Sequence, residues 1–485
     1  MILAALLVAT FSMRAEVKMA GIFTDNMVLQ QQTQAKLWGW ADAGKTVKVK
    51  VSWDAKAKYS TKVAEDGKWC VEVATPQAGG PYTIEVSETN KITLNDVLIG
   101  EVWVCSGQSN MEMPIRGFNN QPIEGAVQAI MEAGNYADRI RAITIGRSFT
   151  EEKQNDITGG KWEKSGVETT PNMSALAYFF GKNIANALQV PVGLVITDWG
   201  GTDIECWMSR ETYTHSMQNV RTQEQIEKRL AYESSNKKHP SRVACLYNAM
   251  IAPIAGYAAK GFVWYQGCNN AKHCYTYYDK MQQAMVQQWR SEWGDMDNKM
   301  PFLYVLIAPH AYHRDPMGER RPFFVLNQMN AAVITPNSAY AVTETLGAGS
   351  CIHPPKKIEI ADQLAHHALI GTYGKDTGMK EAPIVKSCIL KGRTYEVEYH
   401  TSVCPAYADL EEVKGFEVAG ADRVFYPAKA KVNYRTVIVE VPAEVADPQS
   451  LRYAFRNVPD CNLTNRYGFP APPFRTDDWE KVAEK

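Results

Sequence analysis

A serine directly after a short apolar run is the feature of this sequence that most directly suggests chemistry. The run Val102-Trp103-Val104 is β-prone, and the small and polar residues Gly107-Gln108-Ser109-Asn110 follow it. A buried parallel strand has this pattern when it delivers a serine to the carboxyl edge of a sheet, where open α/β folds place their active sites. Ser109 is therefore either the nucleophile of a hydrolase or the cap of the next helix, since Ser and Asn are both good caps.

Three further segments carry groups that a serine nucleophile needs. His353 is the candidate base, because a serine hydroxyl is a weak nucleophile without one. Gly200-Gly201 would offer backbone N–H groups to an oxyanion, and the Asn270 amide would donate another hydrogen bond, worth roughly 3–4 kcal/mol. Each has a structural alternative: a tight turn for the glycines, a helix cap for Asn270 and an ordinary loop position for His353. Together, the four segments favour a serine hydrolase more strongly than any one of them alone.

These segments follow the strands of a predicted α/β region over residues 94–380. The pattern predicts strands at 101–104, 192–198, 261–266, 302–307 and 340–343, with helices at 173–188, 247–259, 275–293 and 358–373. Strands that alternate with helices indicate a mostly parallel sheet covered on both faces. The carboxyl ends of these strands would bring the four segments to one edge.

The regions on either side are predicted to be β-structure. Residues 17–93 alternate apolar and polar positions between Gly and Asp turns, which is typical of a small β-sandwich. Residues 381–485 contain short predicted strands at 383–390, 394–399, 415–418 and 436–441 before a proline-rich end. The apolar run at 2–11 is interpreted either as part of a signal segment over residues 1–16, which implies export, or as an unrelated feature that precedes the first strand.

Composition excludes several classes of protein. The chain has 485 residues, enough for roughly three domains, and is 45% hydrophobic and 22% charged. A net charge of -1 without a basic tract argues against nucleic acid or an anionic membrane surface as a partner. The ten cysteines are scattered, which predicts mostly buried thiols rather than a disulfide framework. Cys268, His273 and Cys274 lack the second tight pair expected of a zinc site, so no metal is predicted.

The order of these motifs resembles the sialate O-acetylesterases, carbohydrate esterases of the SGNH hydrolase superfamily, which is named after Ser, Gly, Asn and His in four blocks. The matching blocks are Gly107-Gln108-Ser109-Asn110-Met111, Trp199-Gly200-Gly201-Thr202, Trp264-Tyr265-Gln266-Gly267 with Asn270, and Ile352-His353-Pro354 with Lys357. The resemblance extends to residues 23–30 and 474–479, so it covers nearly the whole chain. It implies an SGNH (flavodoxin-like) three-layer domain, flanked by an N-terminal β-sandwich and a C-terminal β-rich domain.

The resemblance implies a serine esterase that needs no cofactor and removes O-acetyl groups from a carbohydrate. Sialic acid is the first expectation, and acetylated plant polysaccharide such as xylan is the second. Ser109 would carry the acetyl group and His353 would transfer the proton. The implied oxyanion donors are Gly200, Gly201 and Asn270, and the candidate substrate contacts are Gln108, Gln266 and Trp207, although an aromatic residue beside a helix start is more often part of the core. A catalytically silent carbohydrate-binding protein is the alternative from another class.

Two departures from the family pattern put the orientation of His353 in question. The family usually carries an acidic residue two or three positions before this histidine, where this chain has Ser350 and Cys351. The asparagine block usually reads Gly-Glu-Ser-Asn, and here it is Gly267-Cys268-Asn269-Asn270. Three interpretations stay open: Ser350 or a backbone carbonyl orients His353, Glu344 substitutes for the acid, or the chain only binds sugar. Cys268 and Cys351 would lie close together in the family's geometry, with free thiols as the default and a disulfide as the alternative.

Overall fold

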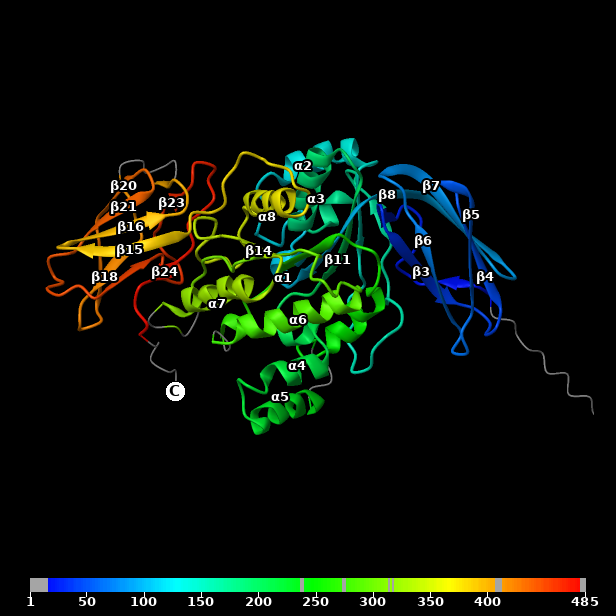
Figure 1. Ribbon diagram of the computed structural model, residues 1–485, viewed down its shortest axis with the longest axis horizontal. Helices are drawn as coiled ribbons and strands as arrows, with labels where there is room; N and C mark the ends of the chain where they lie inside the picture. The colour runs from blue at the N-terminus through cyan, green and yellow to red at the C-terminus, as the bar shows by residue number, and fades with distance from the viewer. Residues whose placement is uncertain are drawn as a thin grey trace, which may run out of the picture.

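The computed structural model describes residues 16–235, 240–272, 276–312, 315, 318–405 and 412–479. At its centre lies a twisted sheet of parallel strands, to which one edge strand is added antiparallel (Figure 1). In spatial order the strands are β10 (Trp162–Lys164), β9 (Ile140–Thr144), β11 (Val192–Asp198), β8 (Lys91–Gly107), β12 (Gly261–Tyr265), β13 (Phe302–Val305) and β14 (Ser338–Ala341).

The long strand β8 belongs to two sheets. Residues 91–99 of β8 pair antiparallel with β7 (Gly79–Ser87), and residues 98–100 pair with β2 (Val28–Gln30). Residues 101–107 then pair in parallel with β11, and residues 103–107 pair with β12. The boundary that the sequence predicts between residues 93 and 94 therefore falls inside one continuous strand.

Helices cover both faces of the central sheet, because neighbouring side chains of its strands point to opposite sides. Trp103 and Cys105 of β8 join one buried cluster, whereas Val102 and Val104 join another. The first cluster is covered by α1 (Ser109–Glu112), α2 (Ala126–Glu132), α3 (Ala175–Leu188) and α8 (Lys357–Gly371). The second is covered by α4 (Arg210–Met217), α5 (Gln223–Ser235), α6 (Tyr278–Glu292) and α7 (Arg320–Ile334). The short helical turns are η1 (Ala133–Tyr136), η2 (Thr170–Asn172), η3 (Ile204–Trp207), η4 (Tyr247–Ile251), η5 (Ala252–Ile254) and η6 (Asn270–Lys272).

The N-terminal region consists of two sheets that share one buried cluster. One sheet contains β1 (Lys18–Met19), β3 (Gln34–Trp40) and β6 (Lys68–Ala74), and the other joins β5 (Asp54–Lys62), β4 (Thr46–Val51) and β7 to the first half of β8. Every second residue of β4 is buried, and so is every second residue of β6. This period of two is the pattern from which the sequence predicts strands.

The C-terminal region has its own core of valine, tyrosine and leucine side chains. Figure 1 shows it in orange and red, at the opposite end of the molecule from the blue N-terminal sheets. Its sheets are β15 (Val385–Lys391), β16 (Thr394–Tyr399), β21 (Thr436–Glu440) and β20 (Ala430–Asn433); β19 (Phe425–Pro427), β18 (Phe416–Ala419), β22 (Ser450–Tyr453) and β24 (Phe474–Arg475); and β17 (Cys404–Pro405) with β23 (Leu463–Thr464).

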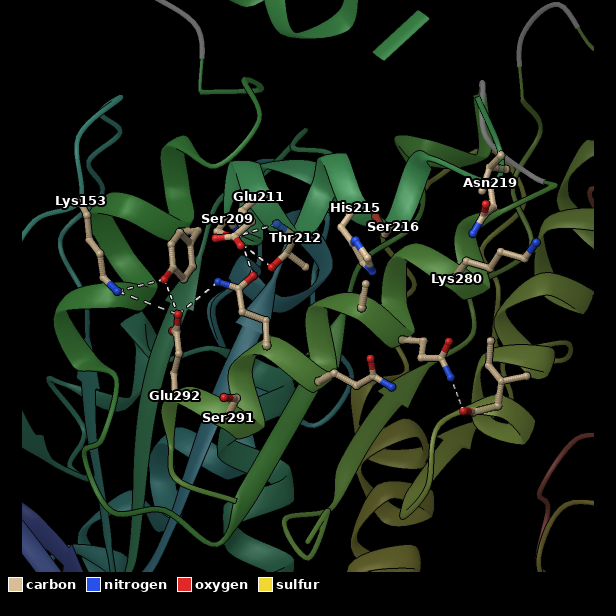
Figure 2. Close-up of a pocket in the computed structure, with 17 residues that line it drawn as sticks. Lys153, Ser209, Glu211, Thr212, His215, Ser216, Asn219, Lys280, Ser291 and Glu292 are labelled. Carbon is tan, nitrogen blue, oxygen red and sulfur yellow. Dashed lines mark hydrogen bonds and ion pairs between the residues drawn. The ribbon is translucent and has the colours of Figure 1, made fainter. Parts of the chain in front are cut away.

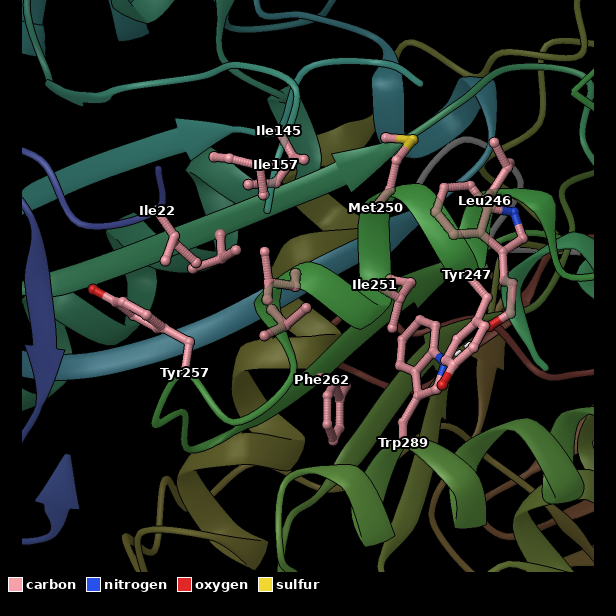
Figure 3. Close-up of a cluster of buried hydrophobic side chains, with 14 of the residues drawn as sticks. Ile22, Ile145, Ile157, Leu246, Tyr247, Met250, Ile251, Tyr257, Phe262 and Trp289 are labelled. Atoms are coloured by element: carbon pink, nitrogen blue, oxygen red, sulfur yellow. Dashed lines mark hydrogen bonds between the residues drawn. The ribbon is translucent and has the colours of Figure 1, made fainter. Parts of the chain in front are cut away.

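The largest buried cluster runs from the N-terminal sheets into the central region (Figure 3). The Tyr257 hydroxyl donates a hydrogen bond to the Val28 carbonyl at 2.7 Å, and Trp162 Nε1 donates one to the Ile22 carbonyl at 2.9 Å. These contacts join the two regions through buried side chains. None of the described helices is both long and apolar enough to cross a membrane.

The predicted elements differ from the observed ones where polar residues are buried or a proline intervenes. The helix predicted at 247–259 ends at Ile254, because Pro253 cannot donate to the preceding turn and Gly256 has a positive φ of 87°. Strands β9 and β10 and helix α7 were not predicted. Arg141, the second residue of β9, is only 1% exposed and pairs with Asp96 at 2.9 Å. The signal segment predicted at residues 1–16 lies outside the described residues, apart from residue 16.

Candidate active site

A pocket of about 500 Å³ opens at the carboxyl edge of the central sheet. It is lined by Gln108, Ser109, Glu112, Arg147, Trp199, Gly200, Gly201, Cys268, Asn269, Lys272, Ile352 and His353. Ser109 begins α1 immediately after β8, and the last residue of β8, Gly107, has a φ of 145°. A side chain on Gly107 would place its Cβ 2.3 Å from the Tyr265 carbonyl oxygen, so only glycine allows the strand to turn into the helix here.

The serine and histidine proposed from sequence are in direct contact. His353 Nε2 lies 2.8 Å from Ser109 Oγ, although the two residues are 244 positions apart in the sequence. The Phe118 ring packs edge-on against the imidazole, with centroids 5.2 Å apart. This arrangement is that expected of a nucleophile with its general base, because the base must lie about 2.6–3.2 Å from the atom whose proton it takes.

Gln121 orients the His353 imidazole, and this glutamine was not predicted from the sequence. Gln121 Oε1 lies 2.6 Å from His353 Nδ1, on the far side of the ring from Ser109. The amide oxygen accepts only if Nδ1 carries the proton, which leaves Nε2 free to accept the Ser109 proton. The turn that holds Gln121 needs glycine at position 117, since a Cβ there would lie 2.3 Å from the Gln121 carbonyl oxygen. No charge or spacing marks this glutamine in the sequence, because it comes from a turn before α2.

Neither residue that the sequence suggested as a partner for His353 fills that role. Glu344 is buried in a bidentate ion pair with Arg321, at 2.6 and 2.8 Å. Ser350 is exposed, and no hydrogen bond to it is found within the described part of the chain. The interpretations that relied on Ser350 and Glu344 are therefore wrong, and a neutral amide occupies the position of the acid.

Burial keeps His353 neutral. Loss of solvent is the main cause that lowers the pKa of His353, and together with the nearby positive charges of Lys357 and His310 it brings this pKa to about 4. A carboxylate partner would oppose this effect, but an amide does not. The imidazole is thus unprotonated near neutral pH, which is the form that a general base needs.

Asn110, next to Ser109, is hydrogen-bonded to the loop that carries His353. Asn110 Nδ2 donates to the Ile352 carbonyl at 3.0 Å, and Lys357 Nζ donates to Asn110 Oδ1 at 2.6 Å. Lys357 is fully buried at the start of α8, and this burial lowers its pKa to about 7. These contacts fix the two residues that flank the catalytic pair, so they support its geometry.

Gly200, the first of the predicted oxyanion donors, lies beside Ser109, and its N–H is already hydrogen-bonded to another side chain. A Cβ on Gly200 would lie 3.2 Å from Ser109 Cβ, which shows how closely the two backbones approach. The Gly200 N–H donates to Glu112 Oε2 at 2.7 Å. Glu112 Oε1 in turn pairs with Arg147 at 2.8 Å. Gly201 lines the same pocket, and its φ of 72° lets the chain turn after β11.

The structure does not bring Asn270 to the pocket. Its side chain is completely buried, donates to Glu205 at 2.9 Å and accepts from the Ile204 N–H at 2.9 Å. The neighbouring Asn269 lines the pocket instead. The prediction that Asn270 reaches the oxyanion is therefore wrong, because η6 starts at Asn270 and turns that side chain towards η3.

Comparison with known proteins identifies the family. A family model described as carbohydrate esterase, sialic acid-specific acetylesterase, matches residues 99–353, just over half of the 485 residues. The chain belongs to this family. Members of the family are carboxylic ester hydrolases.

Individual relatives agree with this assignment. The sialate O-acetylesterase of Rattus norvegicus is 28% identical over 518 aligned positions, which cover 93% of each chain. The Homo sapiens sialate O-acetylesterase is 29% identical over 312 positions, 60% of this chain and 57% of the human one. The crystal structure of a carbohydrate acetylesterase from Xanthomonas citri matches with a TM-score of 0.83 and 29% identity, over 96% of this chain and 100% of that one.

Of the substrate contacts predicted for this esterase, only Gln108 lines the pocket. Gln108 Oε1 accepts from the Gly267 N–H at 3.1 Å. Gln266 is fully buried and bonds to Tyr278 at 2.7 Å, so it lies behind the pocket wall. Trp207 is also fully buried and packs against Trp264, with ring centroids 6.0 Å apart. The predictions that Gln266 and Trp207 contact substrate are therefore wrong, because both belong to the core.

The cysteines near the site of the esterase are reduced. Cys268 and Cys351 are free thiols, so the disulfide alternative is wrong. His273 and Cys274 lie outside the described residues. No group of three potential metal ligands is found among the residues that the structure describes.

A larger pocket of about 1060 Å³ lies between α4 and α6 (Figure 2). Among the residues that line it, Glu292 accepts hydrogen bonds from Tyr247 and from Gln288. His215 also lines it, but no hydroxyl of the described lining residues is hydrogen-bonded to this histidine. The smaller pocket is the one that combines a nucleophile with a base.

Proposed function

We propose that the chain is a sialate O-acetylesterase that works through an acetyl-enzyme on Ser109. The observation that carries this proposal is the Ser109–His353 contact of 2.8 Å in a chain of the sialic acid-specific acetylesterase family. The relatives named sialate O-acetylesterase support sialic acid as the sugar. The intact catalytic pair argues against a silent carbohydrate-binding protein.

In the first half of the reaction, Ser109 Oγ attacks the acetyl carbonyl carbon while its proton passes to His353 Nε2. The tetrahedral intermediate then collapses, the bond to the sugar oxygen breaks, and Nε2 gives its proton to that oxygen. In the second half, water loses a proton to Nε2 and attacks the acetyl-enzyme, which releases acetate and restores the Ser109 hydroxyl. Throughout, Gln121 keeps the proton of Nδ1 in place.

Four donors at the pocket are proposed for the oxyanion. The Ser109 N–H lies at the start of α1, where the first N–H groups of a helix have no partner within the helix. The Gly200 N–H is adjacent, once Glu112 has left it, and Gly201 follows in the same turn. Asn269 Nδ2 donates to Asp203 at 2.6 Å and has a second hydrogen that this contact leaves available.

The proposed catalytic unit is an SGNH hydrolase domain over residues 94–380. The mostly parallel sheet with helices on both faces supports this assignment. We assign residues 17–93 to an N-terminal β-sandwich, whose second sheet continues through β8 into the central sheet. We assign residues 381–485 to a C-terminal β-rich domain, which the separate C-terminal sheets and core support.

Acetate release is the measurement that tests this function. The chain is incubated with O-acetylated sialic acids and with acetylated xylan, beside Ser109→Ala and His353→Ala variants. We expect acetate from the sialic acids with the wild type and at least a thousandfold less with either variant, because the nucleophile and base act as one unit. Release from xylan alone would transfer the assignment to plant polysaccharide, and activity that survives Ser109→Ala would exclude the acetyl-enzyme.

A further inference from the structure

One half-exposed cation stands at the mouth of the Ser109 pocket. Arg147 follows β9, lines the pocket and is 43% exposed. Its Nη2 pairs with Glu112 Oε1 at 2.8 Å and with Asp198 Oδ1 at 3.3 Å, and its Nε donates to the Asp198 carbonyl at 3.4 Å. Arg147 Nη1 makes no hydrogen bond with any residue that the structure describes. The guanidinium is therefore held through Nη2 and Nε, and the N–H groups of Nη1 are left for a ligand.

The Glu112 carboxylate occupies the Gly200 N–H, one of the donors proposed for the oxyanion. Its Oε2 accepts from the Gly200 N–H while its Oε1 is held by Arg147, so a single carboxylate bridges the two. A negative oxyanion forming beside Ser109 would lose the Gly200 donor and would be repelled by Glu112. Glu112 must therefore leave Gly200 before the chemical step, and only its contact with Arg147 opposes that movement by charge.

We propose that Glu112 and Arg147 select for a sugar that carries its own carboxylate. The substrate carboxylate would bind Arg147, release Glu112 from both of its partners and so free the Gly200 N–H for the oxyanion. A neutral acetyl ester would not displace Glu112 in this way. This inference rests on the proposed function, and it assigns a specificity role to two residues that the catalytic mechanism itself does not use.

Arg147 is better suited to this exchange than the other cation of the pocket. Asp198 is buried at the end of β11 and holds Arg147 independently of Glu112, so the guanidinium would stay in place during the exchange. A guanidinium also matches the two oxygens of a carboxylate in a bidentate manner. Lys272 Nζ donates to Asn269 Oδ1 at 2.9 Å, and its ammonium lacks the paired, planar donors that match the two oxygens of a carboxylate.

The test compares two substrates that differ only at the C1 carboxyl group, which is charged in one and a neutral methyl ester in the other. These are an O-acetylated sialic acid and its C1 methyl ester, assayed by acetate release with the wild type and with Arg147→Met, Lys272→Met and Glu112→Ala variants. We expect the wild type to prefer the free acid by about tenfold or more in kcat/KM, since charged hydrogen bonds are the strong ones. Arg147→Met should abolish this preference, whereas Lys272→Met should leave the ratio between the two substrates as it is.

Glu112→Ala gives the second readout. It frees Gly200 permanently, so kcat/KM for the methyl ester should rise towards that for the free acid. The inference is overturned if Glu112→Ala lowers the activity on the methyl ester, or if Lys272→Met rather than Arg147→Met removes the preference. Equal kcat/KM for both substrates with the wild type would also overturn it and leave the proposed function standing. Absence of acetate from both substrates would overturn the two together.

Discussion

Gln121 Oε1 lies 2.6 Å from Nδ1 of His353, and it thereby takes the position that a carboxylate holds in a serine triad. The amide selects the tautomer that a general base needs, as a carboxylate does. Being neutral, it does not stabilise the imidazolium that forms when His353 takes the serine proton. Gln121 thus orients the His353 imidazole correctly but gives its protonated form less electrostatic stabilisation than a carboxylate would.

Replacement of Gln121 measures what orientation alone contributes. We expect Gln121→Ala to lower kcat at least tenfold, because the imidazole loses its tautomer control; in a serine protease, a wrong tautomer costs about 10⁴. Gln121→Glu should raise kcat above the wild type, since it supplies the missing charge. Acetate release under saturating substrate gives both values, and an unchanged kcat in Gln121→Ala would contradict the orienting role.

The dependence of activity on pH should reflect the low basicity of His353. Its pKa is lowered to about 4, and the base works only when neutral, so kcat/KM should fall as the pH drops through about 4 rather than through about 6.5. In Gln121→Glu the new carboxylate favours the imidazolium, which moves this acid limb to higher pH. A wild-type limb near pH 6.5 would argue against a buried, neutral His353.

Two neighbouring asparagines should behave differently when replaced. Asn269→Ala should lower kcat by about 10²–10³ with little change in KM, as the loss of an oxyanion donor does. Asn270→Ala should chiefly lower the melting temperature, because it breaks buried hydrogen bonds to Glu205 and Ile204. Steady-state kinetics and thermal unfolding of both variants check this pair, and the reverse pattern would restore Asn270 as the donor.

Burial of Lys357 should make stability depend on pH. Its pKa is about 7 in the folded chain and about 10.4 when unfolded, so between these values the unfolded state binds more protons. Stability from this group should therefore rise with pH from about 7 to about 10, by at most about 1.4 kcal/mol per pH unit. Urea unfolding of the wild type and Lys357→Met across this range isolates the effect, which should be missing from the variant.

The buried pair of Glu344 and Arg321 should matter for folding rather than for catalysis. Glu344→Gln leaves Arg321 charged and buried, which should cost about 3–5 kcal/mol of stability. The folded variant should retain a kcat within a few-fold of the wild type, because Glu344 has no contact with His353. Denaturant unfolding and acetate release measured on the same preparation separate the two effects.

Local patterns in the sequence predicted most of what lies along single strands. The apolar runs of β11 and β12 are uninterrupted, and the residues that follow them are small or polar. This pattern predicted the carboxyl edge of the sheet and the meeting of Ser109 with His353 at that edge. Strand β9 was not predicted, because Arg141 reads as a surface residue until Asp96, from a distant segment, is seen to pair with it.

By itself the sequence determined the family, the pairing of Ser109 with His353 and the glycine turn after β11, because each depends on residue types at fixed spacing. Tertiary structure alone decided that Gln121 orients His353, that Asn269 rather than Asn270 faces the pocket, and that Glu112 covers Gly200. The physical reason is that Glu112 and Gly200 meet only when the chain folds, whereas Gln121 and Asn269 come from turns, where a shift of one position exchanges a buried amide for one that faces the pocket. Neutral hydrogen-bonding groups of this kind leave no periodic or charged pattern in the chain.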